Sequence, residues 1–396
     1  MLTKVFMGHQ RAPNEHLCNN SLDYSAQNPK GIVQSWRRLA PMASGFCTAG
    51  SGIIPLGHGS PWNEPRSGKG GAMAVRIGFV GVGGIAREHL KNLAELPNAK
   101  ITAVCDTVAS TAQEVGSAHQ CPAYSSHEEM FSRESLDAVY VCIPPFARGP
   151  AEIAAARHGL ALFVEKPVAL DLATAREIQT AVERQNVLVN VGYVYRYLET
   201  VQRARAALAG RTIGMVLGHY LTSAPKSPWW RVKAKSGGQL VEQSTHIVDA
   251  ARYFAGDVAT VSAAAGHRLV RHLEGMDIDD VSSVLLTFES GAIGQIASTC
   301  GSVPSYGTAG LTIFAEGLVV EILGTTGVRI RWPGRLEELQ RSNFSIFRAE
   351  DEAFVRAVET GDRSLVRSTF ADAVKTLAVT LAADESVASG SMVHIS

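Results

Sequence analysis

The glycine-rich stretch from residue 75 to 89, VRIGFVGVGGIAREH, carries a pattern that could bind phosphate. Gly81, Gly83 and Ala86 form a G-x-G-x-x-A sequence between an apolar, β-branched run and an expected helix. In such a turn the first glycine permits the tight bend, and the second lets the backbone approach a pyrophosphate. The small third residue lets the helix pack closely on the strand. The N-terminus of that helix offers unpaired N–H groups to the phosphates. We therefore predict a dinucleotide site.

Asp106 ends the second apolar run, AVCDT, twenty residues after Ala86. A carboxylate at this place accepts hydrogen bonds from the adenosine ribose diol and repels a 2′-phosphate. Thr107 supplies no cation beside it, so the sequence favours NAD over NADP. The alternative for Asp106 is a residue that caps a loop or helix. The predicted cofactor-binding residues are Gly81, Gly83, Gly84, Ile85, Ala86, Asp106, Pro144, Glu165 and Lys166.

His246, in VEQSTHIVDAARYF, is the candidate base. If residues 239–254 form one helix, Glu242 lies four residues before His246 and Asp249 three after, on one face. Imidazole has an ordinary pKa of about 6.5, which suits proton transfer near neutral pH. Glu242 could orient hydroxyl groups, and Asp249 could fix the histidine or hold structure. The alternative for His246 alone is a hydrogen-bonded core histidine.

Aromatic and guanidinium side chains follow in two places that we expect at the junction of two domains. Tyr195 and Arg196 come after the apolar run at 187–191, and Trp230 and Arg231 precede the Gly237–Gly238 turn. Aromatic faces and guanidinium groups commonly bind polyhydroxylated rings. Packing of the tryptophans in the interdomain core is an equally good reading. The predicted substrate-binding residues are Tyr195, Arg196, Trp230, Arg231, Gln243 and Asp249.

Two kinds of repeating pattern indicate the elements that carry these residues. Short apolar runs alternate with segments whose apolar residues have helical spacing, which indicates a parallel sheet with right-handed crossovers. The runs lie at 75–80, 100–105, 137–143, 161–167 and 187–191. After a helix near 198–208 and the one at 239–254, period-2 runs at 258–270, 279–299 and 311–332 indicate an antiparallel or mixed sheet. From Glu350 the sequence is helical again.

Composition excludes several classes of function. Lys plus Arg equals Asp plus Glu at 37 each in 396 residues, which gives no basic footprint for nucleic acid and no polybasic membrane patch. No apolar run approaches the roughly 18 residues of a membrane-spanning helix. The cysteines are scattered without a C-x-x-C pair, so we expect buried free thiols in the cytoplasm and no metal site.

Residues 1–73 differ from the rest because they are rich in Gly, Pro, Ser and Asn and lack an apolar period. We predict a disordered extension, or a start upstream of the native one, since Met73 opens the run MAVRIGFVG. The alternative is a twin-arginine export signal at Arg37–Arg38.

The motifs RIGFVGVGGIAREHL, VYVCIPPFA, FVEKPVAL, GYVYRY and SGGQLVEQSTHIVDAARYFAG occur in an order that resembles the Gfo/Idh/MocA oxidoreductases. The resemblance runs from about Val75 to the end. It implies a Rossmann domain (74–195) and a C-terminal α/β domain (196–396) with an open, mostly antiparallel sheet that often forms subunit contacts. Lys166 resembles the active-site lysine of the family. Glu242 stands where the common pattern has Asp, and this puts its role in doubt.

These features together predict an NAD(P)-dependent oxidoreductase that transfers hydride between nicotinamide and a secondary alcohol or ketone of a sugar, polyol or related cyclic compound. Lys166, His246 and Glu242 are the predicted catalytic residues, and a homodimer or homotetramer through the C-terminal sheet is expected. Two alternatives remain: a redox-neutral lyase or hydrolase that uses bound NAD transiently, and a non-catalytic NAD-binding sensor.

Overall fold

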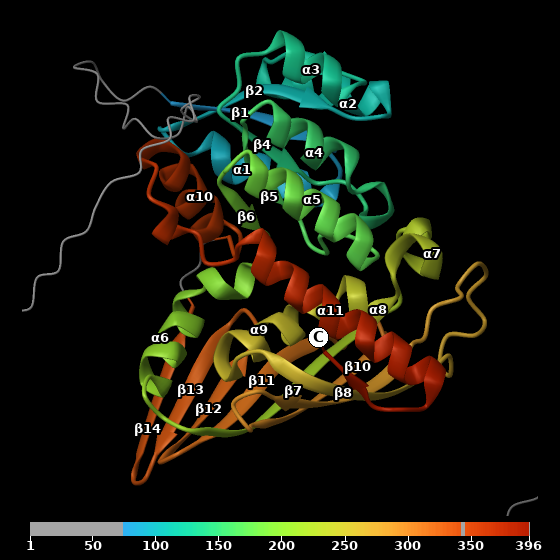
Figure 1. The fold of residues 1–396 in the computed structure, drawn as a ribbon, viewed down its shortest axis with the longest axis vertical. Coiled ribbons are helices and arrows are strands. Elements are labelled where there is room, and N and C mark those ends of the chain that lie inside the picture. Colours follow the sequence, from blue (N-terminus) through green and yellow to red (C-terminus); the bar gives the residue numbers. More distant parts are fainter. Residues whose placement is uncertain (1–73, 342–344, 396) are drawn as a thin grey trace, which may run out of the picture. The chain divides into compact units, whose positions relative to one another are not determined.

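A computed structural model describes residues 74–341 and 345–395 (Figure 1). The predicted extension 1–73, with Arg37–Arg38, lies outside the described residues. The helices are α1 (Gly84–Ala94), α2 (Ala109–His119), α3 (His127–Arg133), α4 (Pro150–Arg157), α5 (Leu172–Arg184), α6 (Glu199–Leu208), α7 (Lys233–Ser236), α8 (Gln239–Glu242), α9 (Thr245–Ala255), α10 (Arg348–Thr360) and α11 (Phe370–Ser389).

The first sheet is parallel, in the order β3-β2-β1-β4-β5-β6. Its strands are β1 (Val75–Val80), β2 (Ala99–Cys105), β3 (Ala123–Tyr124), β4 (Ala138–Val141), β5 (Ala161–Val164) and β6 (Val189–Val191). The chain adds strands on one side of β1 up to β3 and then crosses to the other side at β4. Ligands bind at the carboxyl ends of the strands at such a reversal, so this topology locates a binding crevice beside β1 and β4.

Alternate residues of these strands pack on opposite faces of the sheet. Tyr140 and Phe163 belong to a core shared with α1, α2 and α10. Val139 and Leu162 belong to a second core, shared with α3, α4, α5 and α11. Both faces are therefore covered, which is why the strands read as continuous apolar runs in the sequence.

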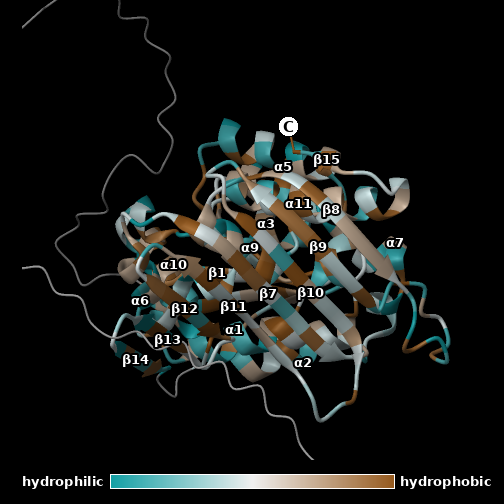
Figure 2. Cartoon of the chain, turned by 90° about the horizontal axis from the view of Figure 1, so that it is seen from below, coloured by the Kyte–Doolittle hydropathy of each residue, from teal (hydrophilic) through white to brown (hydrophobic). Residues whose placement is uncertain are grey.

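The second sheet is mostly antiparallel, in the order β14-β13-β12-β11-β7-β10-β9-β8-β15, with one parallel pair, β7 and β10. Its strands are β7 (Ile213–Ser223), β8 (Val258–Gly266), β9 (Val281–Phe288), β10 (Ile293–Ser302), β11 (Thr308–Ala315), β12 (Leu318–Leu323), β13 (Gly327–Trp332), β14 (Arg335–Gln340) and β15 (Val393–His394). Helices α6, α9 and α11 contact it and share its core. Figure 2 views the opposite face of this sheet. The predicted α/β fold with two kinds of sheet is confirmed.

The C-terminal helices contact both sheets. Phe354 and Val355 of α10 lie in the core that contains β1 and α1. Helix α11 contacts α5 beside the first sheet and β8 and α9 of the second (Figure 1). This long helix therefore connects elements of the two sheets.

The predicted single helix over 239–254 is wrong, because the chain forms α8, a turn at 243–244 and then α9. The amide of Ser244 donates to the carbonyl of Gln239, five residues back, at 2.9 Å. The Ser244 hydroxyl donates to Ser298 of β10 at 2.8 Å, which anchors the turn on the second sheet. Glu242 and His246 therefore do not share a face by helical spacing.

In the described part of the chain, no helix is both long and apolar enough to span a bilayer. Cys105, Cys142 and Cys300 are buried free thiols, as the sequence predicted, and Cys121 is a half-buried one. Cys18 and Cys47 lie outside the described residues.

Candidate active site

A cavity of about 740 Å³ opens at the carboxyl ends of β1, β4 and β5. It is the crevice that the strand order locates. The side facing the first sheet includes Gly81, Gly83, Gly84, Ile85, Asp106, Pro144, Glu165 and Lys166, and the side facing the second includes Trp229, Glu242 and His246. Of the predicted cofactor-binding residues, only Ala86 does not line it. Ala86 is instead fully buried against β1, in the packing role that its small size predicted.

The glycine turn has the geometry that its sequence predicts. Gly81 has φ +81°, and a Cβ there would lie 2.7 Å from the carbonyl oxygen of Cys142. A Cβ on Gly83 or Gly84 would meet no described protein atom within 4 Å. Helix α1 begins at Gly84, and no side chain caps its N-terminus. Open space above uncapped N–H groups is where a pyrophosphate fits, so the turn is suited to a dinucleotide.

We expect the two glycines to respond differently to substitution by alanine. Gly81→Ala strains a left-handed backbone and clashes with a carbonyl, so it lowers the melting temperature. Gly83→Ala leaves the melting temperature unchanged, but its methyl group enters the phosphate space. If it removes one hydrogen bond to a charged phosphate, NADH affinity falls roughly tenfold or more. Thermal unfolding and NADH fluorescence titration check both. Unchanged NADH affinity in Gly83→Ala contradicts this placement of the phosphates.

Asp106 connects the turn to the end of β2. One carboxylate oxygen accepts the amide of Val82 at 3.0 Å, and the other accepts the amide of Val108 at 2.9 Å. The carboxylate is thus fixed at the cavity wall, beside the glycine turn, where the ribose of a dinucleotide on this turn would lie.

Lys166 and Glu242 form an ion pair across the cavity. The ammonium Nζ donates to the Glu242 carboxylate at 3.0 Å and to the Glu242 carbonyl at 2.8 Å. Lys166 follows β5 and precedes a cis peptide bond to Pro167, whereas Glu242 ends α8. The fold thus joins residues 76 positions apart, and His246, at the start of α9, lines the same cavity.

The pKa values of Lys166 and His246 shift in opposite directions. Burial lowers the pKa of Lys166, but the carboxylates of Glu242 and Glu165 outweigh burial and raise it above its usual value. Burial, and then the positive charge of Lys166, lower the pKa of His246 well below 6.5. At neutral pH the site therefore holds an ammonium beside an uncharged imidazole. The Nδ1 atom of His246 has no hydrogen-bond partner among the described residues.

Of the two roles that the sequence left open for Asp249, fixing His246 or holding structure, its contacts agree with the second. The Asp249 carboxylate accepts two hydrogen bonds from Arg196, at 2.8 and 2.6 Å, and one from Thr376 at 3.0 Å. Arg196 also pairs with Asp372. This buried network lies outside the lining of the cavity and joins η2 (Val194–Tyr197), α9 and α11. Arg196 and Asp249 are therefore not brought to the place predicted for substrate binding.

The two adjacent tryptophans have different surroundings. Trp230 is buried with Met276, Ile278 and Cys300, which all belong to residues 196–396, so it packs inside that part of the chain and not in the interdomain core that the sequence left open. Trp229 lines the cavity and meets Phe146 edge to face, with ring centroids 6.4 Å apart. The sequence alone could not distinguish them, because their neighbours come from distant segments.

The remaining predicted residues do not line the cavity. Tyr195 is buried with its ring centroid 6.1 Å from that of His246. Arg231 donates to the carbonyl of Pro225 at 2.9 Å. The side-chain oxygen of Gln243 is buried without a partner in the described structure. Phe146 and Ser227, which the sequence did not single out, do line the cavity.

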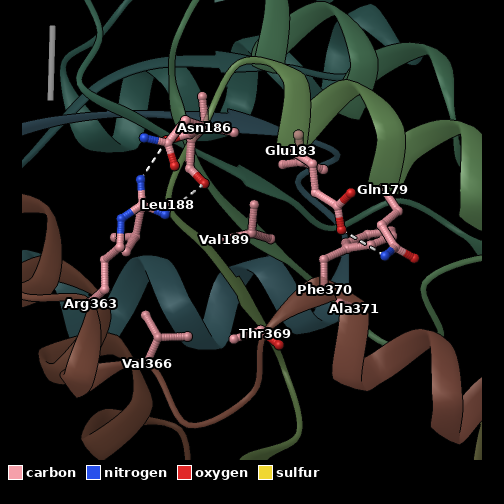
Figure 3. Close-up of a pocket in the computed structure, with 12 residues that line it drawn as sticks. Gln179, Glu183, Asn186, Leu188, Val189, Arg363, Val366, Thr369, Phe370 and Ala371 are labelled. Carbon is pink, nitrogen blue, oxygen red and sulfur yellow. Dashed lines mark hydrogen bonds between the residues drawn. The ribbon is translucent and has the colours of Figure 1, made fainter. Parts of the chain in front are cut away.

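A second hollow of about 290 Å³ lies between α5, β6 and the start of α11 (Figure 3). Arg363 closes one side by donating to the carbonyls of Asn186 and Val187, and Gln179 donates to Glu183 at 2.7 Å on the other side. None of the predicted site residues line it.

Two family models match this chain. The GFO/IDH/MocA model, described as an oxidoreductase family with an NAD-binding Rossmann fold, matches residues 75–193. The GFO/IDH/MocA C-terminal domain matches residues 201–329. The chain belongs to the GFO/IDH/MocA oxidoreductase family. Membership agrees with the resemblance read from the sequence, and it makes the protein an oxidoreductase with an NAD-binding Rossmann domain.

Several proteins resemble this chain at moderate identity. The scyllo-inositol 2-dehydrogenase (NAD(+)) of Bacillus subtilis is 26% identical over 336 residues, which cover 81% of this chain and 96% of that relative. The 2,7-anhydro-N-acetylneuraminate hydratase of Mediterraneibacter gnavus is 27% identical over 223 residues, or 54% and 58% of the two chains. An oxidoreductase domain protein from Kribbella flavida has the same fold, with a TM-score of 0.74 at 20% identity over 82% of this chain and all of that one.

Proposed function

We propose that this protein is an NAD-dependent dehydrogenase that oxidises a secondary alcohol of a cyclic polyol or sugar, or reduces the corresponding ketone. The observation that carries the proposal is the Lys166–Glu242 ion pair in one cavity with His246 and the glycine turn. Relatives named as inositol dehydrogenases support the class of substrate.

Each residue has a role that follows from its charge. A dinucleotide held by the glycine turn and Asp106 would supply the acceptor for the hydride that leaves the substrate carbon. The neutral imidazole of His246 takes the hydroxyl proton as the carbonyl forms. The ammonium of Lys166 donates a hydrogen bond to the reacting oxygen and stabilises its developing negative charge. Glu242 holds that ammonium in place from the opposite wall.

A substrate panel tests the proposal. Inositols, sugars and sugar acids are incubated with the full chain and NAD⁺ or NADP⁺, and reduced cofactor is followed at 340 nm. We expect reduction of NAD⁺ by at least one cyclic polyol or sugar. Failure of every alcohol, in both directions of the reaction, would remove the proposed activity.

A redox-neutral reaction is the second candidate, because one similar protein is named a hydratase. It predicts that substrate disappears while no net NADH accumulates. Product analysis by mass spectrometry distinguishes the two, since a dehydrogenase changes the substrate by two mass units and a hydratase by one water.

We also propose that copies of the chain associate through the open face of the second sheet. In the described structure, Met215 on β7 is paired in register with Ile293 on β10 and Phe314 on β11, and all three are 40–47% exposed. Leu217 and Leu285 extend this apolar row at 39% and 49% exposed. Figure 2 shows the strands that carry it. Apolar surface in one contiguous patch is typical of an interface.

Met215→Glu is expected to lower the molar mass measured by light scattering after gel filtration. It places a charge at the centre of the apolar row, where burial against a second copy is unfavourable. Met392→Glu is the control, because Met392 is 54% exposed and lies outside this row. A wild-type monomer, or an unchanged oligomer in Met215→Glu, contradicts the proposed interface.

The compartment stays a prediction. The free thiols described above support the cytoplasm, where such thiols remain reduced. Fractionation of cells that express the full chain tests it, and recovery in an exported fraction would favour the twin-arginine alternative.

A further inference from the structure

A buried charged cluster lies behind the cavity, on the far side of Glu165. His89, on α1, is fully buried, and its Nδ1 lies 2.7 Å from a carboxylate oxygen of Asp351 on α10. Its Nε2 lies 3.0 Å from a carboxylate oxygen of Glu165. Asn92 and Tyr140 also donate to Asp351, at 2.8 and 3.1 Å. The imidazole of His89 thus connects α1, which begins at the glycine turn, to Glu165, the residue before Lys166.

Both ring nitrogens of His89 face carboxylate oxygens, so both act as donors and the ring is an imidazolium. Burial by itself lowers the pKa of His89, but Asp351 and Glu165 outweigh burial and hold it well above its usual value. His89, Glu165 and Glu350 offer donor atoms within 4.8 Å of one another, as a metal site would. However, an imidazolium has no lone pair for a metal. Burial raises the pKa of Glu350 well above its usual range, which favours the neutral acid over the carboxylate that a metal would need.

Glu165, which His89 contacts, also binds the backbone of Lys166. Its second carboxylate oxygen accepts the backbone amide of Lys166 at 3.1 Å. Its carbonyl accepts Arg148, which also donates to the carbonyl of Val141 at the end of β4. A Cβ on Gly192 would lie 2.7 Å from the Glu165 carboxylate, so the space around Glu165 is filled. The backbone of Lys166 is therefore held by the side chain of Glu165, which in the described part of the chain is held in turn by His89.

We propose that His89 is a positioning residue that couples the dinucleotide-binding turn to the Lys166 ammonium through Glu165. The inference rests on the proposed function for its effect on turnover. His89 touches neither substrate nor cofactor, since it does not line the cavity.

The test compares substitutions around the same carboxylate. His89→Phe removes both hydrogen bonds of the ring, whereas Asn92→Ala and Tyr140→Phe each remove one hydrogen bond to Asp351 and leave the Glu165 contact intact. We expect His89→Phe to lower kcat by about 100-fold, the scale of a misplaced catalytic group. Asn92→Ala and Tyr140→Phe keep kcat close to the wild-type value. His89→Gln, whose amide can donate to Glu165, recovers part of the loss.

A second measurement needs no substrate. Acetylation of Lys166 by acetic anhydride, followed by mass spectrometry of its peptide, reports how firmly the ammonium is held against Glu242. We expect faster acetylation of Lys166 in His89→Phe and an unchanged rate in Asn92→Ala. If wild-type protein turns over no substrate but this difference is found, the proposed function fails and the positioning role stands.

Three results overturn the inference. One is wild-type kcat and wild-type acetylation of Lys166 in His89→Phe. Another is an equal loss in Asn92→Ala, which would mean general damage to the core. A third is a stoichiometric divalent metal in the purified protein that His89→Phe loses. If His89→Phe does not fold, His89→Gln and Asp351→Asn are compared with Asn92→Ala on the same two measurements.

Discussion

Lys166→Ala is expected to lower kcat/KM for the alcohol substrate by about 10³-fold, the upper range for loss of one donor that stabilises a developing oxyanion. The substitution removes the only cation that Glu242 contacts in the described structure, and with it the charge that we propose faces the reacting oxygen. Lys166→Arg keeps the positive charge but spreads it over a planar group, so we expect an intermediate loss. Lys375→Ala, which removes an exposed lysine paired with Asp257, is the matched control.

The pH dependence of the same variant separates an electrostatic role from a structural one. The charge of Lys166 helps to lower the pKa of His246, although burial contributes more. In wild-type protein the acid limb of kcat/KM therefore lies below pH 6.5, where the imidazole becomes protonated. Without Lys166 the pKa of His246 rises, and the acid limb moves to higher pH. Full turnover in Lys166→Ala, or an acid limb that moves downward, contradicts the assigned roles.

The parts of the site that the sequence predicts best are those fixed by local geometry. Gly81 needs a left-handed backbone, Gly83 needs open space, and Asp106 must directly follow β2; each requirement appears within a few residues of the pattern. The first sheet was predictable for the same reason, because strands buried on both faces leave continuous apolar runs. The meeting of Lys166 with Glu242 is different. It depends on how two sheets pack, and only the resemblance to a family indicated it beforehand.

The wrong predictions concern side chains whose partners are distant in sequence, so local patterns could not indicate them. Arg196 and Asp249 pair with each other and with α11, and no helical spacing reveals a partner on another helix. The helix break at 243–244 depends on Ser298, which lies 54 residues away. His89 was missed because it lies on the buried face of α1, where the sequence indicated only an amphipathic helix. The sequence signal that could have indicated this cluster was a histidine at a core position of the helix, with acidic residues elsewhere in the chain.

Cofactor preference gives the second large effect. Asp106→Ser is expected to lower kcat/KM with NAD⁺ by about 10- to 100-fold, because it removes a charged acceptor worth about 1.5–3 kcal/mol to the ribose diol. Activity with NADP⁺ rises at the same time, since the 2′-phosphate no longer meets a carboxylate. The ratio of the two kcat/KM values is the measurement, because any general damage affects both cofactors alike.

The ratio of kcat/KM with the two cofactors is needed because Asp106 also has a structural role. Its carboxylate also accepts the amides of Val82 and Val108, so any substitution disturbs the turn as well as the ribose contact. Asp106→Asn keeps one acceptor oxygen at nearly the same place and removes the charge. If repulsion of the phosphate sets the preference, Asn and Ser shift the ratio toward NADP⁺ by similar factors, although Asn preserves more activity with NAD⁺. Glu114→Gln removes an exposed carboxylate of α2 that pairs with Arg87 and serves as the charge control. A ratio that stays at the wild-type value in both Asp106 variants would place the adenosine ribose elsewhere.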